Sequence, residues 1–228
     1  MAEVSVIIGV YNKGRFIKET IESVLSQTFK DFELIIVDDC SKDNSARIIK
    51  DYAKKDKRIK FIQNRHNLGS TKSRNVALKA ASGKYIAVLD ADDVMLPKRL
   101  EIQHKFLEKH KNIFLVGSSA IVIDENGKKI GHFWKYHRFP WIVNLRLNRL
   151  SVFVHSSVMY RNDGMLYNEE YKRGEDPEFY LRARRENKNM VNLFRPLVKY
   201  RIDPGGIMAT KTLKNDPYAQ KLRREYVK

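Results

Sequence analysis

Short apolar runs alternate with helix-like segments over the first 110 residues, and this alternation limits the fold more than any other feature. Each run is followed by a segment whose apolar positions recur at helical spacing. Runs that are apolar throughout are typical of parallel strands covered on both faces. The sequence therefore predicts an α/β fold, with a mostly parallel, Rossmann-like sheet flanked by helices. The expected strands are residues 4–8, 32–37, 59–62 and 85–89, and the expected helices are 16–29, 44–53, 70–81 and 97–109.

Polar residues follow three of the expected strands at the point where each strand ends. Residues 11–13 follow the first strand, residues 38–39 follow the second, and residues 90–93 follow the fourth. Ligands of such sheets bind beyond the carboxyl ends of the strands. We therefore expect one binding site at this edge of the sheet.

The segment 90–93 holds three carboxylates directly after a buried strand. Crowded, buried carboxylates are costly unless something neutralises them. Because alternate residues of an extended chain point the same way, Asp90 and Asp92 can converge on one point. Two carboxylates suit Mg²⁺ or Mn²⁺ when phosphate oxygens complete the metal's shell. The cluster indicates either a divalent-metal site for a phosphorylated ligand or a solvated turn.

The net charge of +17 favours an anionic partner. Nucleic acid, an acidic membrane surface and a phosphorylated substrate all fit, and so does a Lys-rich surface with no specific partner. Cys40 is the only cysteine, so no intrachain disulfide can form, as is usual in a reducing cytoplasm. No stretch approaches the roughly 18–20 apolar residues that cross a bilayer. We expect a cytoplasmic protein, or one at the inner face of the membrane through peripheral contact.

The second half of the sequence is less regular. Strands are expected at 114–123, 152–160 and 190–201, a helix at 177–186, and a further helix within the basic residues 204–228. Residues 131–150 are rich in aromatic and basic side chains. This segment fits an acceptor wall, a membrane-interface patch, or ordinary packing against the core.

Two common nucleotide-binding motifs are missing from the sequence. It contains neither G-x-G-x-x-G nor G-x-x-x-x-G-K-[ST], which argues against a dinucleotide fold and a P-loop. The six histidines show no metal-ligand spacing, so we interpret most of them as surface or packing residues, and Cys40 as structural.

A series of short segments carries a further signal: residues 4–12, 23–28, 33–41, 67–69, 73–75, 83–85 and 89–93. Their order and spacing resemble the family 2 glycosyltransferases with the GT-A fold. The resemblance covers residues 4 to about 110 and thins afterwards to residues 174–176 and 200–201. It implies a single domain in which residues 1–110 bind a nucleotide-diphosphate sugar and residues 111–228 bind the acceptor.

The resemblance implies how the donor is held. Tyr11 and Asp39 would hold the base, and Lys13 and Arg74 would contact phosphate, although both could instead be solvated surface charges. The expected nucleotide-binding residues are Gly9, Tyr11, Asn12, Lys13, Asp39, Arg74 and Asp90.

The resemblance also implies a metal and a catalytic base. Asp92 is the expected direct ligand of Mn²⁺ or Mg²⁺, and Asp90 binds metal or ribose. Asp176 corresponds to the base with which the family inverts the anomeric centre, and before Pro177 it also fits a helix N-cap. Asp203 stands where the family often carries a histidine, so we assign no metal or phosphate role to that loop.

The expected activity is therefore transfer of a sugar to a glycan or lipid-linked acceptor, in the synthesis of cell-surface polysaccharide or glycolipid. A UDP-sugar is favoured as donor, a GDP- or dTDP-sugar is possible, and no nucleic acid is expected. Two alternatives remain. A sugar nucleotidyltransferase would usually carry a Gly-rich basic loop, which residues 9–15 lack. A non-catalytic anion-binding module would explain the charge but not the acid cluster.

Overall fold

The computed structural model describes residues 2–134, 139–147, 152–202, 221 and 225–226. Strands and helices alternate through the first half of the chain, as predicted. That half contains β1 (Val4–Val10), α1 (Ile17–Leu25), β2 (Phe32–Asp38), α2 (Ser45–Lys55), β3 (Ile59–Gln63), α3 (Ser70–Ala80), β4 (Tyr85–Val88), β5 (Val94–Met95) and α4 (Arg99–Lys109). The second half contains β6 (Ile113–Ile123), β7 (Lys129–Phe133), α5 (Pro140–Leu147), the 3₁₀ helix η1 (His155–Ser157), β8 (Met159–Arg161), α6 (Glu175–Arg185) and β9 (Asn189–Arg201).

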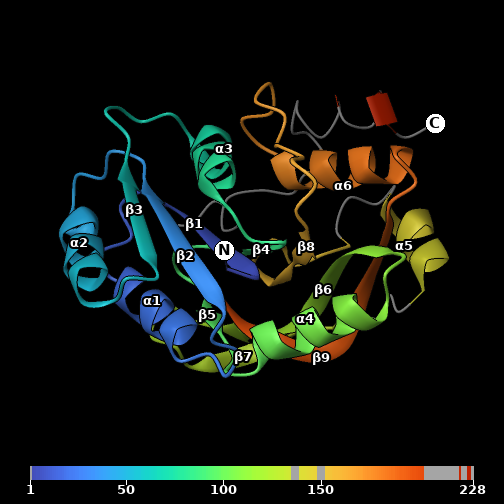
Figure 1. The fold of residues 1–228 in the computed structure, drawn as a ribbon, viewed down its shortest axis with the longest axis horizontal. Coiled ribbons are helices and arrows are strands. Elements are labelled where there is room, and N and C mark those ends of the chain that lie inside the picture. Colours follow the sequence, from blue (N-terminus) through green and yellow to red (C-terminus); the bar gives the residue numbers. More distant parts are fainter. Residues whose placement is uncertain (1, 135–138, 148–151, 203–220, 222–224, 227–228) are drawn as a thin grey trace.

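The strands of the described residues form one sheet in the order β3-β2-β1-β4-β8-β6-β9-β5, with β7 paired to β6 (Figure 1). The pairs β3-β2, β2-β1 and β1-β4 are all parallel. The strand β8 runs antiparallel to β4 and to β6, which joins the two halves of the chain. The predicted α/β fold with a mostly parallel sheet is confirmed.

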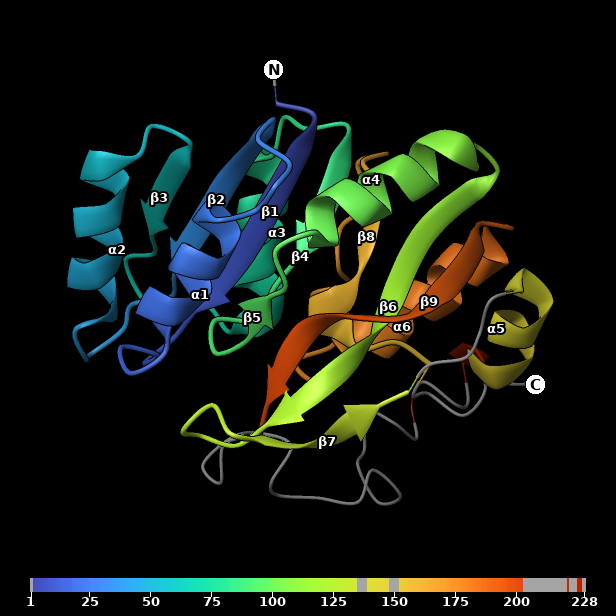
Figure 2. The same ribbon diagram turned by 90° about the horizontal axis from the view of Figure 1, so that it is seen from below.

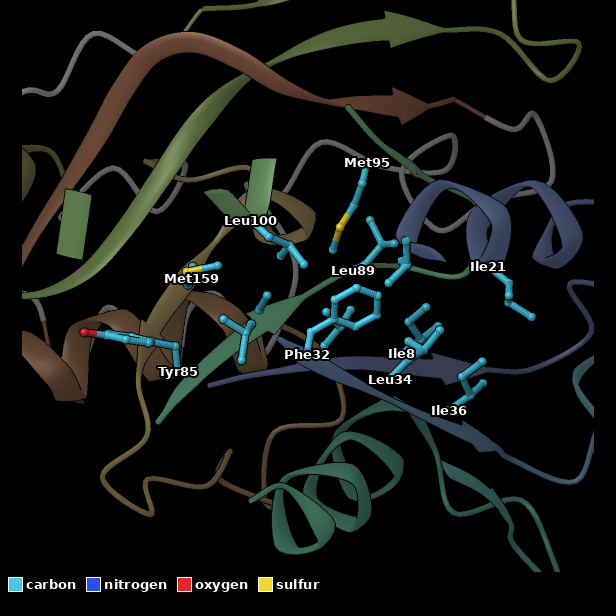
Figure 3. Packing of buried hydrophobic residues seen from close by; sticks show 14 of the residues in the cluster. Ile8, Ile21, Phe32, Leu34, Ile36, Tyr85, Leu89, Met95, Leu100 and Met159 are labelled. Atoms are coloured by element: carbon cyan, nitrogen blue, oxygen red, sulfur yellow. The ribbon is translucent and has the colours of Figure 1, made fainter. Parts of the chain in front are cut away.

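Two apolar cores cover the two faces of the sheet. Alternate residues of β1 serve different cores: Ile8 faces the first and Ile7 the second. Figure 3 shows side chains of the first core, which includes residues of α1, α2 and α4. The second core includes residues of α3, α5 and α6. Because β1 and β2 are buried on both faces, they form a firm base for the loops at their carboxyl ends.

The predicted strand at 152–160 is wrong. Residues 155–157 form η1, and only Met159–Arg161 pairs as a strand. The Ser156 hydroxyl accepts a hydrogen bond from Asp90 N (2.7 Å), and the buried guanidinium of Arg99 donates to Ser156 O (2.6 Å). Side chains therefore take the place of the sheet ladder in this segment.

Other differences concern element ends and unpredicted elements. Helix α1 ends at Leu25 rather than at residue 29, because the Gln27 side chain donates to Leu96 O (2.9 Å) and the backbone of Thr28 donates to Pro97 O (2.9 Å). The sequence did not predict β5, β7 or α5. Of the expected helix within 204–228, all but residues 221, 225 and 226 lie outside the described residues.

Within the described residues, no helix is both long enough and apolar enough to span a bilayer.

Candidate active site

The carboxyl ends of β1, β2 and β4 meet at one edge of the sheet, as the sequence predicts. Strand β1 lies between β2 and β4 and is parallel to both. Asp39 N donates to Val10 O (2.7 Å), and Lys13 Nζ lies 2.6 Å from Asp92 Oδ2. The loops after the three strands therefore contact one another and form a single site.

The loop after β1 is braced by the loop after β2. Asn12 adopts a left-handed conformation (φ 52°), and its backbone N–H donates to Ser41 Oγ (2.9 Å). Its side-chain oxygen accepts from Lys42 N (2.7 Å). Tyr11, next to it, is 46% exposed. Asn12 thus shapes the loop, and the Tyr11 ring is available for stacking.

Asp39 shapes a second loop. Its carboxylate accepts hydrogen bonds from Asn64 Nδ2 (2.9 Å), Leu68 N (2.8 Å) and Gly69 N (2.8 Å). Gly69 has φ 86°, a conformation that favours glycine, and leads directly into α3. Asp39 therefore holds the 64–69 loop against the end of β2.

Arg74 of α3 bridges the two halves of the chain. Its guanidinium donates to Asp90 Oδ1 (2.8 Å) and to Glu175 Oε1 (2.5 Å). Burial alone would lower the pKa of Arg74, but the charges of Asp90 and Glu175 raise it well above its usual value. Gly9 lies nearby, and a Cβ added there would meet Arg74 Cγ at an ordinary 3.8 Å, so contact with Arg74 does not require glycine.

The acid loop, residues 90–93, is held on both sides. The backbone of Asp90 donates to Ser156 Oγ (2.7 Å), and the Asp92 side chain accepts from Lys13. Arg201, at the end of β9, donates from its backbone N–H to Asp93 Oδ1 (2.8 Å) and from Nε to Asp92 O (2.8 Å). The end of β9 therefore fixes the position of the acid loop.

The surroundings of Asp90 and Asp93 shift the pKa values of these two groups in opposite directions. Burial would raise the pKa of Asp90, but the charge of Arg74 holds it below its usual value. Burial, together with the charges of Asp90 and Asp92, raises the pKa of Asp93 well above its usual value. Asp93 Oδ2 is buried and has no hydrogen-bond partner within the described part of the chain. The acid loop therefore buries the carboxyl group of Asp93.

Asp176 lies at the start of α6, near enough to the acid loop for the charge of Asp90 to help raise its pKa. Gly174, with φ 74°, occupies the N-cap position, and α6 begins at Glu175. The predicted N-cap role of Asp176 is therefore wrong: Asp176 lies within the first turn, where its side chain is half-buried. Burial and the neighbouring Glu175 raise the pKa of Asp176 to about 7. A carboxylate with this pKa can accept a proton at neutral pH.

A sequence model of the family described as glycosyl transferase family 2 matches residues 5–165. The chain belongs to glycosyltransferase family 2. The match contains the loops after β1, β2 and β4 and the acid loop, so most of the site lies inside it.

Individual relatives agree with this assignment. A protein of Methanocaldococcus jannaschii described as a glycosyltransferase is 41% identical over 205 residues, which cover 87% of this chain and 70% of the relative. An Escherichia coli protein, the UDP-Glc:alpha-D-GlcNAc-diphosphoundecaprenol beta-1,3-glucosyltransferase WfgD, is 38% identical over 130 residues, which cover 57% of this chain and 50% of WfgD.

Solved structures give the same fold. Residues 1–349 of Staphylococcus aureus TarS in complex with UDP superpose with a TM-score of 0.74 at 27% identity, covering 90% of this glycosyltransferase and 61% of the TarS chain. The complex of TarS with UDP-GlcNAc gives a TM-score of 0.77 at 25% identity, covering 93% and 62%. This family 2 glycosyltransferase thus has the GT-A fold, and it spans about three fifths of those TarS chains.

The acid loop of this glycosyltransferase fits a divalent cation. The carboxylate oxygens of Asp90 and Asp92 are hard donors of the kind that suits Mg²⁺ or Mn²⁺. Asp93 Oδ2 has no partner among the described residues, and burial together with the charges of Asp90 and Asp92 raises the pKa of that group. A cation bound nearby would favour the ionised form of Asp93 and lower its pKa.

Among the described residues, the group that brings three metal-type ligand atoms within 4.8 Å of one another is Glu3, His104 and Glu108, not the acid loop. This cluster lies before β1 and on α4, at the end of the sheet opposite the acid loop. Lys84 Nζ lies 2.6 Å from Glu108 Oε1 and 3.5 Å from Glu3 Oε1, and the cluster lies away from the sheet edge that carries Tyr11, Asp39 and the acid loop. We assign no metal to this cluster.

Sequence reasoning missed His155. Its Nδ1 lies 2.7 Å from Tyr180 Oη and its Nε2 lies 3.0 Å from Tyr167 Oη. Burial, with the positive charge of Arg74, lowers the pKa of His155 to about 3, so the ring is neutral. A neutral imidazole has one donor and one acceptor nitrogen, and both are used here. His155 therefore positions Tyr180 of α6, one turn after Asp176. The isolated histidine in the sequence gave no signal of this role.

Some predicted positions cannot be placed. Asp203, and residues 135–138 and 148–150 of the aromatic-basic segment, lie outside the described residues.

Proposed function

We propose that this protein is a metal-dependent, inverting glycosyltransferase that moves a sugar from a nucleotide-diphosphate sugar to a hydroxyl group of a glycan or lipid-linked acceptor. The observation that carries the proposal is the bridge through Arg74. One guanidinium contacts both Asp90 of the acid loop and Glu175, the neighbour of Asp176. The donor-binding edge and a proton acceptor near neutral pH are thus parts of one site.

The donor half would be residues 1–110. Tyr11 would stack on the base, and Gly9, Asn12 and Asp39 belong to the loops that would surround the nucleoside. A UDP-sugar is favoured, because TarS structures hold UDP and UDP-GlcNAc and the name of WfgD specifies UDP-Glc. The exposed ring of Tyr11 and the firmly held loop at Asp39 support this placement.

A Mn²⁺ or Mg²⁺ ion would be held by Asp92, with Asp90 as second ligand or as a ribose contact. When bound, such an ion stabilises the negative charge of the departing nucleoside diphosphate. Lys13 contacts Asp92 at 2.6 Å, and Arg74 contacts Asp90 at 2.8 Å. The Lys13 and Arg74 side chains would therefore lie beside the diphosphate and add positive charge there.

Asp176 would act as the base. The acceptor oxygen would attack the anomeric carbon on the face opposite the diphosphate, so that one C–O bond forms as the C–O bond to phosphate breaks. The proton of the acceptor hydroxyl would pass to the Asp176 carboxylate. Attack from the opposite face inverts the anomeric centre. The raised pKa of Asp176, about 7, supports this role.

The acceptor would bind to residues 111–228, in cell-surface polysaccharide or glycolipid synthesis. The acceptor of WfgD, a diphosphoundecaprenol-linked sugar, supports a lipid-linked class. Such an acceptor would place the enzyme in the cytoplasm, at the inner face of the membrane. The sugar nucleotidyltransferase and the anion-binding module find no support, because the chain matches family 2.

The test is a donor screen. UDP-, GDP- and dTDP-sugars are incubated with the protein and Mn²⁺, and release of nucleoside diphosphate is measured with and without chelator. We expect metal-dependent release from a UDP-sugar. The absence of release and of binding for every donor would contradict the proposal.

A further inference from the structure

Exposed large hydrophobic side chains are concentrated in one part of the molecule. Among the described residues, most of them come from the stretch 130–145 or from β9. Those from this region are Ile130, Phe133, Trp134, Phe139, Trp141, Leu145 and Phe194. Large exposed apolar clusters on a soluble domain commonly mark an interaction surface.

A bulge in β9 produces part of this cluster. Ser118 of β6 pairs with Leu193, but the next residue, Ser119, pairs with Pro196. Phe194 and Arg195 therefore leave the ladder, and both are exposed. The Phe194 ring stacks on Trp134 with centroids 5.0 Å apart. Bulges re-aim side chains at the expense of pairing, and this one presents an aromatic and a basic residue to solvent.

Helix α5 adds a second part. Val143 and Leu147 are buried in the core beneath it. Trp141 and Leu145, four residues apart and so on one face of the helix, are 66% and 69% exposed. A short helix that is apolar on both faces is expected to be covered on both. Among the described residues, none covers the outer face of α5 at Trp141 and Leu145.

Both parts adjoin β9. Phe194 of β9 stacks on Trp134, which follows β7, and α5 contacts β9; Figure 2 shows β7 at the bottom of the view and α5 at the right. We call Trp134, Phe139, Trp141, Leu145 and Phe194 together the aromatic face.

The segment that supplies most of the aromatic face carries charge of one sign. From residue 126 to residue 162 the sequence contains no Asp or Glu, but seven Lys or Arg residues. Of the described ones, Lys129 and Arg146 are exposed, as is Arg195 in the bulge. Trp together with Lys and Arg is the combination that favours the interface of an anionic bilayer.

We propose that the aromatic face docks the enzyme on the surface of an anionic phospholipid bilayer, with Trp141, Leu145 and Trp134 entering the interface and the basic residues contacting headgroups. The proposal deepens the proposed function, because a lipid-linked acceptor is reached only at a membrane. Binding to lipid is independent of donor turnover, so the two can fail separately.

The experiment measures co-sedimentation of the full chain with vesicles of phosphatidylglycerol and phosphatidylcholine, and with vesicles of phosphatidylcholine alone. We expect binding to the anionic vesicles that weakens as salt rises. The double variant Arg146→Glu/Arg195→Glu should bind about tenfold more weakly or worse. Its matched control is Lys54→Glu/Lys55→Glu, which changes the net charge equally at exposed positions of α2 and should bind almost like the wild type. Trp141→Ser/Leu145→Ser should also lose binding.

Circular dichroism and release of nucleoside diphosphate from the soluble donor show whether each variant is folded and active. Failure of the wild type to bind anionic vesicles would overturn the proposal. Equal loss in the α2 control would overturn it too, because the effect would then be net charge alone. Light scattering that shows a wild-type dimer dissociated by Trp141→Ser/Leu145→Ser would instead make the aromatic face a contact between two copies, and would equally overturn it.

Discussion

Arg74 on α3 and Glu175 on α6 form a direct ion pair, 2.5 Å from Nη1 to Oε1, between segments 101 residues apart in the sequence. The other arm of the same guanidinium contacts Asp90. This single side chain therefore ties the acid loop to the start of the helix that carries Asp176.

Replacing Arg74 by Met should weaken both stability and activity. Removing one partner of a buried ion pair costs about 3 kcal/mol, and Asp90 and Glu175 would then lie close together without compensation. We expect a lower midpoint of urea denaturation and a larger loss of kcat than Arg74→Lys causes. Equal activity of Arg74→Met and the wild type would show that the bridge is not needed for catalysis.

Activity should rise with pH through the pKa of Asp176. A base works only when deprotonated, and kcat/KM reports the groups that titrate in the free enzyme. We therefore expect kcat/KM to increase with pH up to an apparent pKa of about 7 and to level off above it. The measurement is a pH profile of transfer at saturating Mn²⁺. A rate that is flat between pH 5 and 8 would exclude Asp176 as the titrating base.

Stability should show the opposite trend for the same residue. The pKa of Asp176 is higher in the folded chain (about 7) than its usual value of 3.8, so the folded state binds more protons between these values. The contribution of Asp176 to stability is therefore lost as pH rises through that window. Asp176→Asn should raise the melting temperature at pH 8 relative to the wild type, and little at pH 4. If the melting temperatures of Asp176→Asn and the wild type differed by the same amount at pH 8 and at pH 4, the raised pKa would be contradicted.

Replacing Asp92 by Asn should remove metal-dependent catalysis while the fold survives. We expect a loss of transfer of at least about 100-fold, since a charged ligand of the reacting site is removed, together with loss of Mn²⁺-induced thermal stabilisation. Asp124→Asn, an acid in the turn before β7, is the matched control and should retain both. Mn²⁺ stabilisation that persists in Asp92→Asn would refute the metal assignment.

The hydrogen bond between His155 and Tyr180 should matter for rate more than for donor binding. Tyr180→Phe keeps the ring but removes the hydroxyl that lies 2.7 Å from His155 Nδ1. Because α6 then loses a fixed point one turn after Asp176, we expect kcat to fall about tenfold with the KM for donor unchanged. A change in KM alone, measured by initial rates over donor concentration, would argue against positioning of the base.

The parts of the site that follow directly from strand ends could be predicted from the sequence. Tyr11, Asp39 and Asp92 come one to three residues after apolar runs, and parallel pairing must bring such ends to one edge. The structure adds what they contact: Asp39 holds the 64–69 loop, and Asp92 contacts Lys13.

The parts that depend on distant contacts could not be predicted. No periodicity reveals that Arg201 would fix the backbone of the acid loop, 109 residues away from Asp92. Residues 152–160 read as a strand because Val and Phe dominate, but contacts of Ser156 with the acid loop bend the chain into η1. Asp176 before Pro177 resembled a cap, whereas Gly174 reaches the left-handed conformation and begins the helix earlier.

The most direct test of the central claim compares the wild type with Asp176→Asn in single-turnover transfer from a UDP-sugar to a hydroxyl acceptor with Mn²⁺, while UDP binding is measured in parallel by calorimetry. We predict unchanged UDP affinity and a rate reduced by about 10²–10⁴-fold, the usual contribution of a general base. A transfer rate within a few-fold of the wild type, at equal UDP affinity, would contradict the account.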